Sequence, residues 1–554
     1  MTNENNFFSR VTYFNLIQFV LAIVCTGLIL WISDKCLMLP DEGLYYAYLN
    51  PHIDNYHSLF NYDLIFKILY RYTKIEIGIW ESRLLRFFLL LLLFVSLLPL
   101  FKRLGLKLHE KIFLLFTLFG GYGLMPQSLS YYTLCLILAV LYFLFFYYSE
   151  TFKKIFYLNY ILLGFICSLS YIVKPPFALL LFVLLQFRIL LFAFQNKYSH
   201  LIWGFILSNL SFWLFQFWLH YLFPHYSFWN VIEDGRLLQS FPGQHNGLYI
   251  IKLFLSSFQW TLVLIGAGFV LGYKKIKFTK INISIRYLIS VLLISVFIIK
   301  HWSSNRFGLA EYSITSSSLV VLGYLFSDLN YKNLSHEKIL IFILLFTMPF
   351  ILIIGSNIYF FRIGQYYSFF WWLLVLYLSK ETNRLMLMVN YLYLLLSSLV
   401  IYNIYLNHIK WRINNKELLS KNVSFNYSSN KPIYISDDQK KYFSKLKNKL
   451  KQYSNSTNKS KVIGIYEPSG EVLFCGADIF YNPLYVGTHN LWAYFTYVKS
   501  DKEYKSIFPL IITKDIDMAK NDLSNYYDSQ VLDSIPHWGG GKMYIIQTFK
   551  LERK

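Results

Sequence analysis

Two adjacent carboxylates, Asp41 and Glu42, are the residues of this chain whose types and spacing most directly suggest chemistry. Ionised carboxylates side by side repel each other, and such a pair is suited to accepting a proton or holding a cation. The alternative interpretation is that the two carboxylates are simply solvated at the end of a loop. The pair follows soon after a long apolar segment at residues 12–33, which therefore must help to position it.

The composition is that of an integral membrane protein. Hydrophobic residues make up 56% of the 554-residue chain and aromatic residues 20%, and apolar runs of helix-spanning length recur along it. The formal net charge of +22 would suit a nucleic-acid-binding protein. However, the Lys and Arg residues are spread through short connections and a polar tail, without a basic helix or an aromatic-basic module. We therefore expect membrane lipids, and no nucleic acid, as partners.

The apolar segments predict about thirteen transmembrane helices. The first is interpreted as an uncleaved signal anchor, because it lacks a small-residue cleavage site. The segments lie at residues 12–33, 85–101, 112–125, 129–148, 156–173, 177–194, 201–222, 251–273, 287–299, 313–327, 338–354, 367–379 and 385–406.

Basic residues are unevenly shared between the two sides of such a bundle. With the N-terminus inside, the inner short connections carry most of them, as the positive-inside rule requires. The long loop at residues 34–84 and everything after residue 406 then lie outside. A few outer cations work against this bias and need another explanation. Those considered for a site are Arg83, Lys174, Arg236 and Arg306.

The rest of the chain predicts a polar tail and a small domain. The tail is rich in Asn, Ser and Lys, with one amphipathic helix near residues 440–453. In the small domain, residues 462–466, 471–474 and 543–549 have strand character, and a glycine-rich turn at 537–541 precedes the last strand. We thus expect a multi-span α-helical membrane domain at residues 1–411, a polar linker at 412–460 and a small extracytoplasmic α/β domain at 461–554.

Several polar motifs follow one another on the predicted outer side. They are Pro40-Asp-Glu-Gly-Leu-Tyr-Tyr46, His57-Ser-Leu-Phe-Asn-Tyr62, Glu81-Ser-Arg-Leu-Leu85, the span from Gly164 to Lys174, the loop from Trp229 through Arg236 and His245 to Tyr249, and the segment from Lys300 to Tyr312. Their order and spacing over residues 1–330 resemble the GT-C membrane glycosyltransferases, specifically the protein O-mannosyltransferases and the lipid A aminoarabinose transferases.

The sequence departs from that family in one place that matters for catalysis. Many relatives carry an acidic residue at the start of the fourth span, where this chain offers only Gln127, Ser128 and Ser130. A second catalytic acid is therefore not expected from this position. No cofactor is assigned, and the involvement of a divalent metal is left open.

The resemblance implies an enzyme that transfers a sugar from a polyprenyl phosphate to an acceptor hydroxyl, with inversion. Asp41 would be the base and Glu42 its helper. Cations would hold the donor phosphate. The residues implied for the phosphate are Lys174, Arg83, Arg236 and Arg306, and those implied for substrate contacts are Tyr45, Tyr46, His57, His245 and Tyr312.

The resemblance also implies a location and an acceptor. It places the protein in a bacterial inner membrane, with the site and the C-terminal domain on the periplasmic side, and favours lipid A or another glycolipid over a protein acceptor. A lipid-linked sugar transporter or flippase and a non-catalytic scaffold are the alternatives from other classes. A transporter predicts charged residues within its spans. For the outer cations and aromatic residues, the alternative is simple anchoring at the membrane interface.

Overall fold

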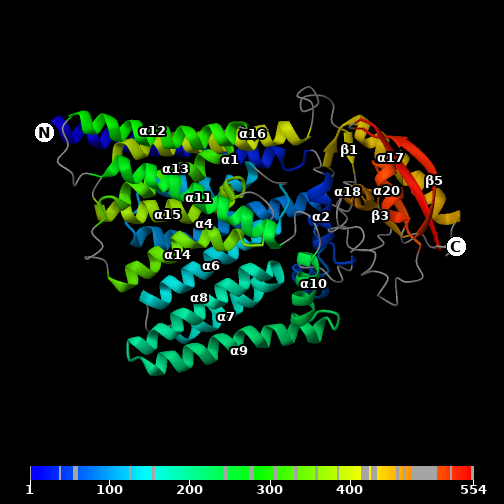
Figure 1. Ribbon diagram of the computed structural model, residues 1–554, viewed down its shortest axis with the longest axis horizontal. Coiled ribbons are helices and arrows are strands. Elements are labelled where there is room, and N and C mark those ends of the chain that lie inside the picture. Colours follow the sequence, from blue (N-terminus) through cyan, green and yellow to red (C-terminus); the bar gives the residue numbers. More distant parts are fainter. Residues whose placement is uncertain are drawn as a thin grey trace.

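Long apolar helices run side by side through most of the chain, and a smaller α/β unit lies against one end of them (Figure 1). We call this the domain end of the bundle, and the opposite end, where α1 begins, the far end. The structure is a computed structural model. It describes residues 2–35, 39–53, 60–123, 127–151, 156–240, 247–273, 280–303, 310–329, 335–355, 360–382, 386–412, 423–425, 433–456, 461–465, 469–475, 508–524, 527–538 and 540–550.

Every apolar segment predicted from the sequence overlaps a helix of the bundle, and in the described residues eight helices are long and apolar enough to cross a membrane. The chain is therefore a helical membrane protein. The bundle helices are α1 (Thr2–Ile32), α4 (Ile79–Arg103), α5 (Leu108–Phe119), α6 (Tyr131–Thr151), α7 (Phe156–Val173), α8 (Pro175–Phe194), α9 (Tyr198–Leu222), α11 (Gly247–Gly272), α12 (Lys280–Ser303), α13 (Ala310–Phe326), α14 (His336–Ile353), α15 (Phe360–Thr382) and α16 (Met386–Arg412).

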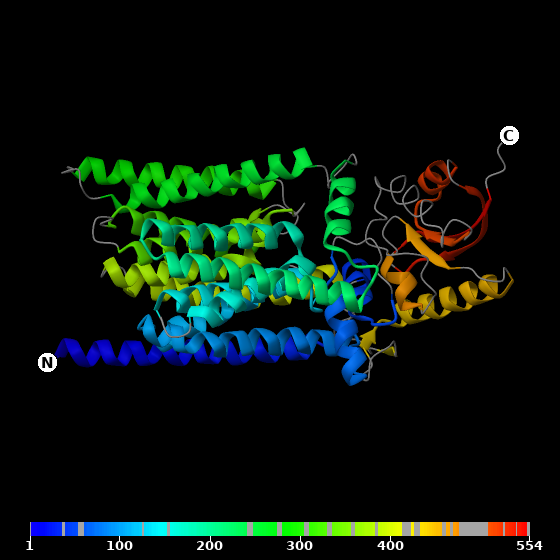
Figure 2. The same cartoon turned by 90° about the horizontal axis from the view of Figure 1, so that it is seen from below.

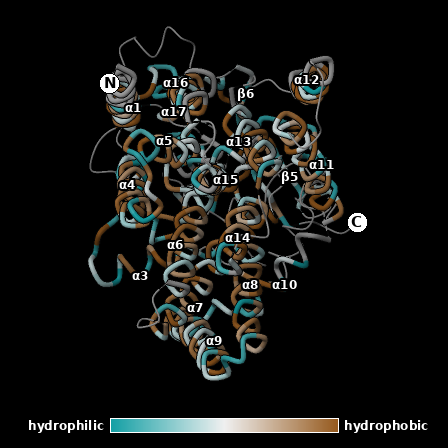
Figure 3. The backbone as a smooth tube through the Cα atoms, turned by 90° about the vertical axis from the view of Figure 1, so that its left-hand side faces the viewer, coloured by the Kyte–Doolittle hydropathy of each residue, from teal (hydrophilic) through white to brown (hydrophobic). Residues whose placement is uncertain are grey.

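Helix α15 lies in the middle of the bundle, whereas α1, α9 and α12 lie at its edge (Figure 3). The burial agrees, since Trp371 and Trp372 of α15 are fully buried while Ile289 of α12 and Phe217 of α9 are exposed. An apolar side chain on the outside of such a helix faces lipid, because contact with water would be unfavourable for it.

The close contact between α11 and α13 depends on one glycine from each helix. Gly268 of α11 faces the backbone of Val320, and Gly323 of α13 faces the backbone of Ile265, each without room for a Cβ atom. Between helices in lipid, van der Waals packing supplies much of the association energy, so this reciprocal contact favours the α11–α13 pair.

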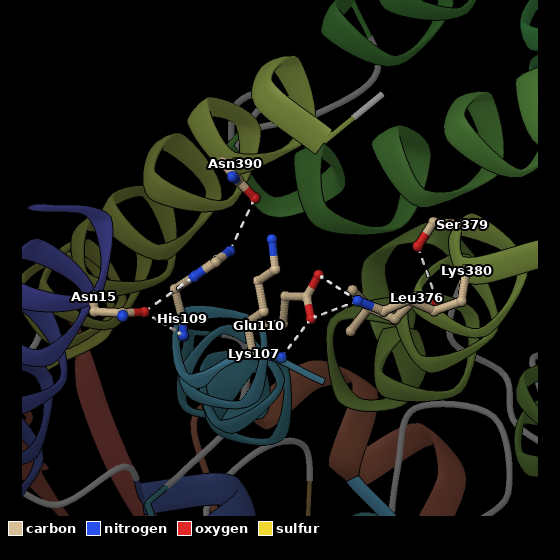
Figure 4. Close-up of polar contacts among 8 residues, drawn as sticks. All are labelled: Asn15, Lys107, His109, Glu110, Leu376, Ser379, Lys380 and Asn390. Carbon is tan, nitrogen blue, oxygen red and sulfur yellow. Dashed lines mark hydrogen bonds and ion pairs between the residues drawn. The ribbon is translucent and has the colours of Figure 1, made fainter. Parts of the chain in front are cut away.

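A buried polar cluster joins four helices at the far end (Figure 4). The His109 ring lies between two amides, with Nδ1 3.0 Å from Oδ1 of Asn15 and Nε2 3.0 Å from Oδ1 of Asn390. Beside it, the Lys380 ammonium lies 3.3 Å from Oε2 of Glu110. These contacts tie α1, α5, α15 and α16 together at the end of the bundle that the sequence assigns to the inner side.

Short helices lie across the bundle at the domain end (Figure 2). Helix α3 carries apolar residues on one side and Lys and Arg residues on the other, the pattern of a helix that lies at a membrane interface. The short helices of this region are α2 (Leu39–Leu49), α3 (Asp63–Thr73), η1 (Gly120–Gly123) and α10 (Phe228–Ser240).

The C-terminal unit is a mixed sheet with helices packed against it. Its four-stranded sheet has the order β3-β4-β6-β5, in which β3 and β4 are parallel and the other neighbours antiparallel. Strands β5 and β6 form a hairpin, in which β5 was not predicted from the sequence. The predicted glycine-rich turn lies between them and places Gly540 and Gly541 at positive φ. The unit consists of β1 (Val423–Phe425), β2 (Ile433–Ile435), α17 (Asp437–Ser456), β3 (Val462–Ile465), α18 (Ser469–Phe474), β4 (Leu510–Thr513), α20 (Ile516–Leu523), β5 (Tyr527–Pro536) and β6 (Lys542–Lys550).

Two sequence-based expectations for this region differ from the structure. Residues 471–474 lie in helix α18, so the strand predicted there was wrong; an apolar run this short does not distinguish a strand from a helix. Helix α17, predicted as part of a linker, instead packs into the core of the C-terminal unit through Phe443 and Leu446. That core also includes Tyr46 of α2 and Ile79 of α4, so the unit and the membrane bundle share it.

Candidate functional site

Helix α2 brings the predicted acidic pair to the boundary between the bundle and the C-terminal unit. Asp41 lies in the first turn of this helix, in a segment that the sequence analysis assigned to a loop. The side chain of Asp41 lies outside the described part of the structure. Glu42, the next residue, is fully buried. A buried carboxylate needs a cation and hydrogen-bond donors, because the charged form loses its hydration.

Arg83 of α4 supplies that cation. Its Nε lies 3.0 Å from Oε1 of Glu42 and its Nη2 lies 2.7 Å from Oε2, a two-pronged contact that matches the planar guanidinium to the carboxylate. The hydroxyl of Ser128 donates a further hydrogen bond to Oε1 at 3.0 Å. Of the three polar residues noted near the start of the fourth predicted span, Gln127, Ser128 and Ser130, it is Ser128 that binds the acid of α2.

The same guanidinium also holds the end of α1. Nη1 of Arg83 donates to the carbonyl oxygens of Ser33 at 2.8 Å and Lys35 at 2.9 Å. Lys35 in turn forms a parallel bridge with Tyr434, and the Tyr434 amide donates to the carbonyl of Asp34 at 2.8 Å. Arg83 thus connects the membrane bundle, helix α2 and the C-terminal unit. These contacts give it a structural role, while its predicted phosphate contact stays a prediction.

A row of tyrosine rings continues inward from α2. Tyr45 meets the ring of Tyr131 edge-on, with the ring centres 6.2 Å apart. The ring centres of Tyr131 and Tyr132 lie 4.0 Å apart. The ring centres of Tyr132 and Tyr366 of α15 lie 5.7 Å apart, and the Tyr366 ring neighbours that of Tyr367. Tyr45 was predicted as a substrate contact, whereas the other four rings were not singled out in a chain so rich in aromatic residues.

Several polar atoms near this row are buried without a hydrogen-bond partner in the described residues. They include the hydroxyls of Tyr62 and Tyr367 and the Oε1 atom of Gln127. Buried polar groups of folded proteins nearly always have a partner, so such atoms mark a place where water or a ligand would be accommodated. Their position beside α2 and α6 makes this region the candidate site.

Lys174 lies in the single-residue link between α7 and α8, with Pro175 opening the second helix. Its ammonium donates to the carbonyl of Leu352 at 2.8 Å, and the residue is only 2% exposed. Burial lowers the pKa of Lys174 to about 8, because the charged form has lost most of its hydration. The predicted contact of Lys174 with a donor phosphate stays a prediction.

An apolar cavity of about 230 Å³ begins beside this lysine. A Cβ atom added to Gly355, which lines the cavity, would lie 3.8 Å from Cε of Lys174 and 3.0 Å from Cγ of Pro176. Gly355 thus lies between the cavity and Lys174, whose ammonium is bonded to the Leu352 carbonyl. Its lining residues come from α11 and from the α14–α15 connection, and are Ile250, Ile251, Leu253, Phe254, Leu255, Ser257, Ile353, Ile354, Gly355 and Phe360.

Arg86 is a cation of the bundle interior that the sequence interpretation missed. It lies three residues after Arg83, so the two occupy the same side of α4, and it is fully buried. Its guanidinium carbon stands 3.9 Å from the ring centre of Tyr122 and 5.5 Å from that of Tyr366. The spacing from Arg83 could have revealed it, because a charged residue within a span is rare without a function.

The remaining predicted residues fall in different places. Tyr46 is buried against the C-terminal unit, Tyr312 is buried at the start of α13, and Arg236 is exposed on α10. The described structure thus brings together Glu42 and Arg83, places Tyr45 against Tyr131, and leaves Arg236 at the surface. His57, His245 and Arg306 lie outside the described residues.

No group of three or more His, Cys, Asp or Glu side chains that could hold a metal occurs within the described ranges. The chain was also compared with known proteins. No family model, curated protein or solved structure matches it.

Proposed function

We propose that this protein is a membrane glycosyltransferase that moves a sugar from a polyprenyl-phosphate donor to an acceptor hydroxyl. The observation that carries the proposal is an apolar cavity whose lining residue Gly355 neighbours the buried Lys174. A lipid phosphate needs both parts, since its chain requires an apolar surface and its head a cation.

The reaction assigns one task to each part of the site. Asp41 takes the proton of the acceptor hydroxyl, whose oxygen bonds to the anomeric carbon from the side opposite the phosphate. The bond between that carbon and the phosphate oxygen breaks, and the polyprenyl phosphate leaves with its negative charge next to Lys174. Glu42 is held by Arg83 and Ser128, so its helping role is to fix the helix that carries Asp41.

The setting of the reaction follows from the charge distribution of the bundle. With all thirteen predicted segments spanning the membrane, the basic connections lie inside and the domain end lies outside. The proposed site is then on the periplasmic side of a bacterial inner membrane. A glycolipid such as lipid A is the proposed acceptor, and a protein Ser or Thr hydroxyl is the alternative within the same reaction class.

Mass spectrometry of surface glycolipids and glycoproteins from cells with and without this protein tests the reaction and its acceptor. We expect one sugar-bearing species to disappear without the protein and to return with the wild-type chain but not with Asp41→Asn. Identical glycan profiles in all three strains would refute the transferase.

Binding of a polyprenyl phosphate to the purified protein tests the donor site independently of the acceptor. Leu253→Trp should fill the cavity and weaken binding about tenfold or more. Leu292→Trp on the exposed side of α12 is the matched control and should bind like the wild type. Equal affinity in both variants would remove the cavity from the donor site.

A lipid-linked sugar transporter is the second candidate, and Arg86 is the observation that favours it. Together with the buried Arg188 of α8, it places charged residues inside two predicted spans, as a transporter requires. Proteoliposomes that contain the protein distinguish the two candidates. Movement of a labelled lipid-linked sugar between leaflets, lost in Arg86→Met and kept in Asp41→Asn, would favour the transporter over the enzyme.

A further inference from the structure

Helices α2 and α18 lie side by side at the boundary between the bundle and the C-terminal unit (Figure 1). Gly43 and Gly470 stand at their crossing, where a Cβ atom added to Gly43 would lie 2.2 Å from the Cα of Gly470. The two backbones are therefore in direct contact, with no flexible side chain between them to absorb a displacement. A shift of α18 is passed on to α2, which carries Asp41 two residues before Gly43.

The carboxylate of Glu471, the residue after Gly470, fixes α18 within the C-terminal unit. It is buried, with 2% of the residue exposed. Its Oε1 lies 3.0 Å from Nε2 of His537, in the turn between β5 and β6, and its Oε2 accepts a hydrogen bond from the hydroxyl of Tyr442 on α17. Such contacts hold a buried carboxylate firmly, because without them its charge would lack compensation. Glu471 thus ties α18 to two other parts of the unit.

The cluster around Glu471 suits a structural task rather than a reaction. Both carboxylate oxygens already have a partner and the group is shielded from water, so a substrate does not reach it. Burial and the neighbouring Glu471 carboxylate raise the pKa of the Cys475 thiol well above its usual range, which keeps this thiol neutral and unreactive. What the cluster determines is the position of α18.

Helix α2 is thus held by two buried glutamates. Glu42 fixes it to the bundle through Arg83, and Glu471 fixes the helix that packs against it. We propose that Glu471 is a positioning residue of the transferase: acting through α18, it sets the place of α2 and of Asp41 from the C-terminal unit. The inference rests on the proposed function, in which Asp41 takes the acceptor proton. Such a transfer needs hydrogen-bond reach, and a displacement of about 1 Å can lower the rate about a hundredfold.

Hydrogen exchange of the α2 amides, measured by mass spectrometry on the full chain in detergent, tests the positioning without any substrate. The test variant is Glu471→Ala, which removes both contacts of the carboxylate. Glu471→Gln is the conservative variant, because its side-chain amide can still bond to both Tyr442 and His537.

The matched control is Asp533→Ala. Asp533 also binds a tyrosine hydroxyl and a cationic side chain, since its Oδ2 lies 3.2 Å from the hydroxyl of Tyr453 and 2.9 Å from Nζ of Lys449. It stands on β5, at the opposite edge of the sheet from β3, the strand that α18 contacts. The amides of β4 serve as an internal control in every variant.

We expect the α2 amides to exchange at least about tenfold faster in Glu471→Ala, and within about twofold of the wild type in Glu471→Gln and Asp533→Ala. The β4 amides should be unchanged in all three. Should Glu471→Ala not fold, Tyr442→Phe removes a single hydrogen bond and should still speed α2 exchange about threefold or more. Unchanged α2 exchange, or an equal increase in α2 and β4, would overturn the proposal, since the cluster would then only stabilise the unit.

Sugar transfer in cells at matched protein levels, followed by mass spectrometry of surface glycans, separates this inference from the proposed function. The rate of product formation should fall at least about tenfold in Glu471→Ala and stay within about twofold in Glu471→Gln and Asp533→Ala. Faster α2 exchange with an unchanged rate would overturn the role of Glu471 in positioning Asp41. If the wild type yields no product, the transferase is refuted, and the α2 exchange alone decides whether Glu471 fixes the helix.

Discussion

The guanidinium of Arg83 and the carboxylate of Glu42 lie 2.7 Å apart, with neither side chain more than 1% exposed. The pair joins a membrane-spanning helix to the short helix that carries Asp41. Both charged groups are shielded from water, so each depends on the other to compensate for its lost hydration. The pair therefore controls both the stability of the domain end and the placement of the predicted base.

Glu42→Gln should strongly destabilise the protein. The change leaves the buried Arg83 without its counter-charge, and breaking a buried pair in this way costs about 3–5 kcal/mol. We expect a clearly lower melting temperature in detergent. Glu76→Gln is the control, because Glu76 contacts His52 in a pair that is more than half exposed, where such changes cost at most about 1 kcal/mol. Equal melting temperatures of the two variants would contradict the assigned role.

Asp41→Asn should separate catalysis from stability. The amide keeps the size of the side chain but cannot accept the acceptor proton, so sugar transfer should be lost. Folding and binding of the polyprenyl phosphate should stay unchanged, which distinguishes this variant from Glu42→Gln. Transfer at the wild-type rate would remove Asp41 from the role of base.

The sequence was sufficient to predict the bundle, because membrane spans depend on local apolar length alone. Each predicted segment overlaps a helix, although five bundle helices do not meet the length and hydropathy expected of a span. Helix α15 illustrates why: it is buried in the centre and packs against other helices, so polar residues such as Gln365 are accommodated there. The strand predicted at residues 471–474 failed because its pattern was too short.

The site was harder to predict, since it depends on contacts between distant segments. The sequence indicated Glu42 and Arg83 separately, but their pairing across 41 positions is visible only in the structure. Ser128 was noted as a missing acid rather than as a donor to Glu42. The row from Tyr131 to Tyr367 could not be recognised, because aromatic residues make up 20% of the chain and are expected at membrane interfaces.

Donor binding should depend on pH through Lys174. Burial lowers the pKa of Lys174 to about 8, so the ammonium that attracts phosphate is present below that pH and is lost above it. Affinity for a polyprenyl phosphate should fall about tenfold between pH 7 and pH 9.5, since a hydrogen bond to a charged group contributes about 1.5–3 kcal/mol. Titration of the purified protein at several pH values measures this directly.

Lys174→Arg provides the control for that titration. A guanidinium keeps its charge over the whole range, so binding by this variant should be nearly independent of pH. Lys174→Ala should bind weakly at every pH. The same pH dependence in the wild type and the Arg variant would assign the titration to another group, and would leave Lys174 as an interfacial anchor.

Gly43→Ala should loosen the C-terminal unit from the bundle. A Cβ atom at Gly43 would lie 2.2 Å from the Cα of Gly470, and a backbone atom cannot move aside as a side chain could. Helix α18 must therefore shift away from α2. Cys475, a free thiol that is 3% exposed just after α18, reports this movement.

We expect maleimide labelling of Cys475, followed by peptide mass spectrometry, to become at least about tenfold faster in Gly43→Ala, because opening the contact by about 1.4 kcal/mol changes the open population by that factor. Gly27→Ala in α1 is the control, since a Cβ atom there meets nothing within 4 Å. If both variants label like the wild type, the contact of α2 with α18 does not hold the unit in place. If only Gly43→Ala labels faster and its sugar transfer falls as well, the unit positions the helix that carries Asp41.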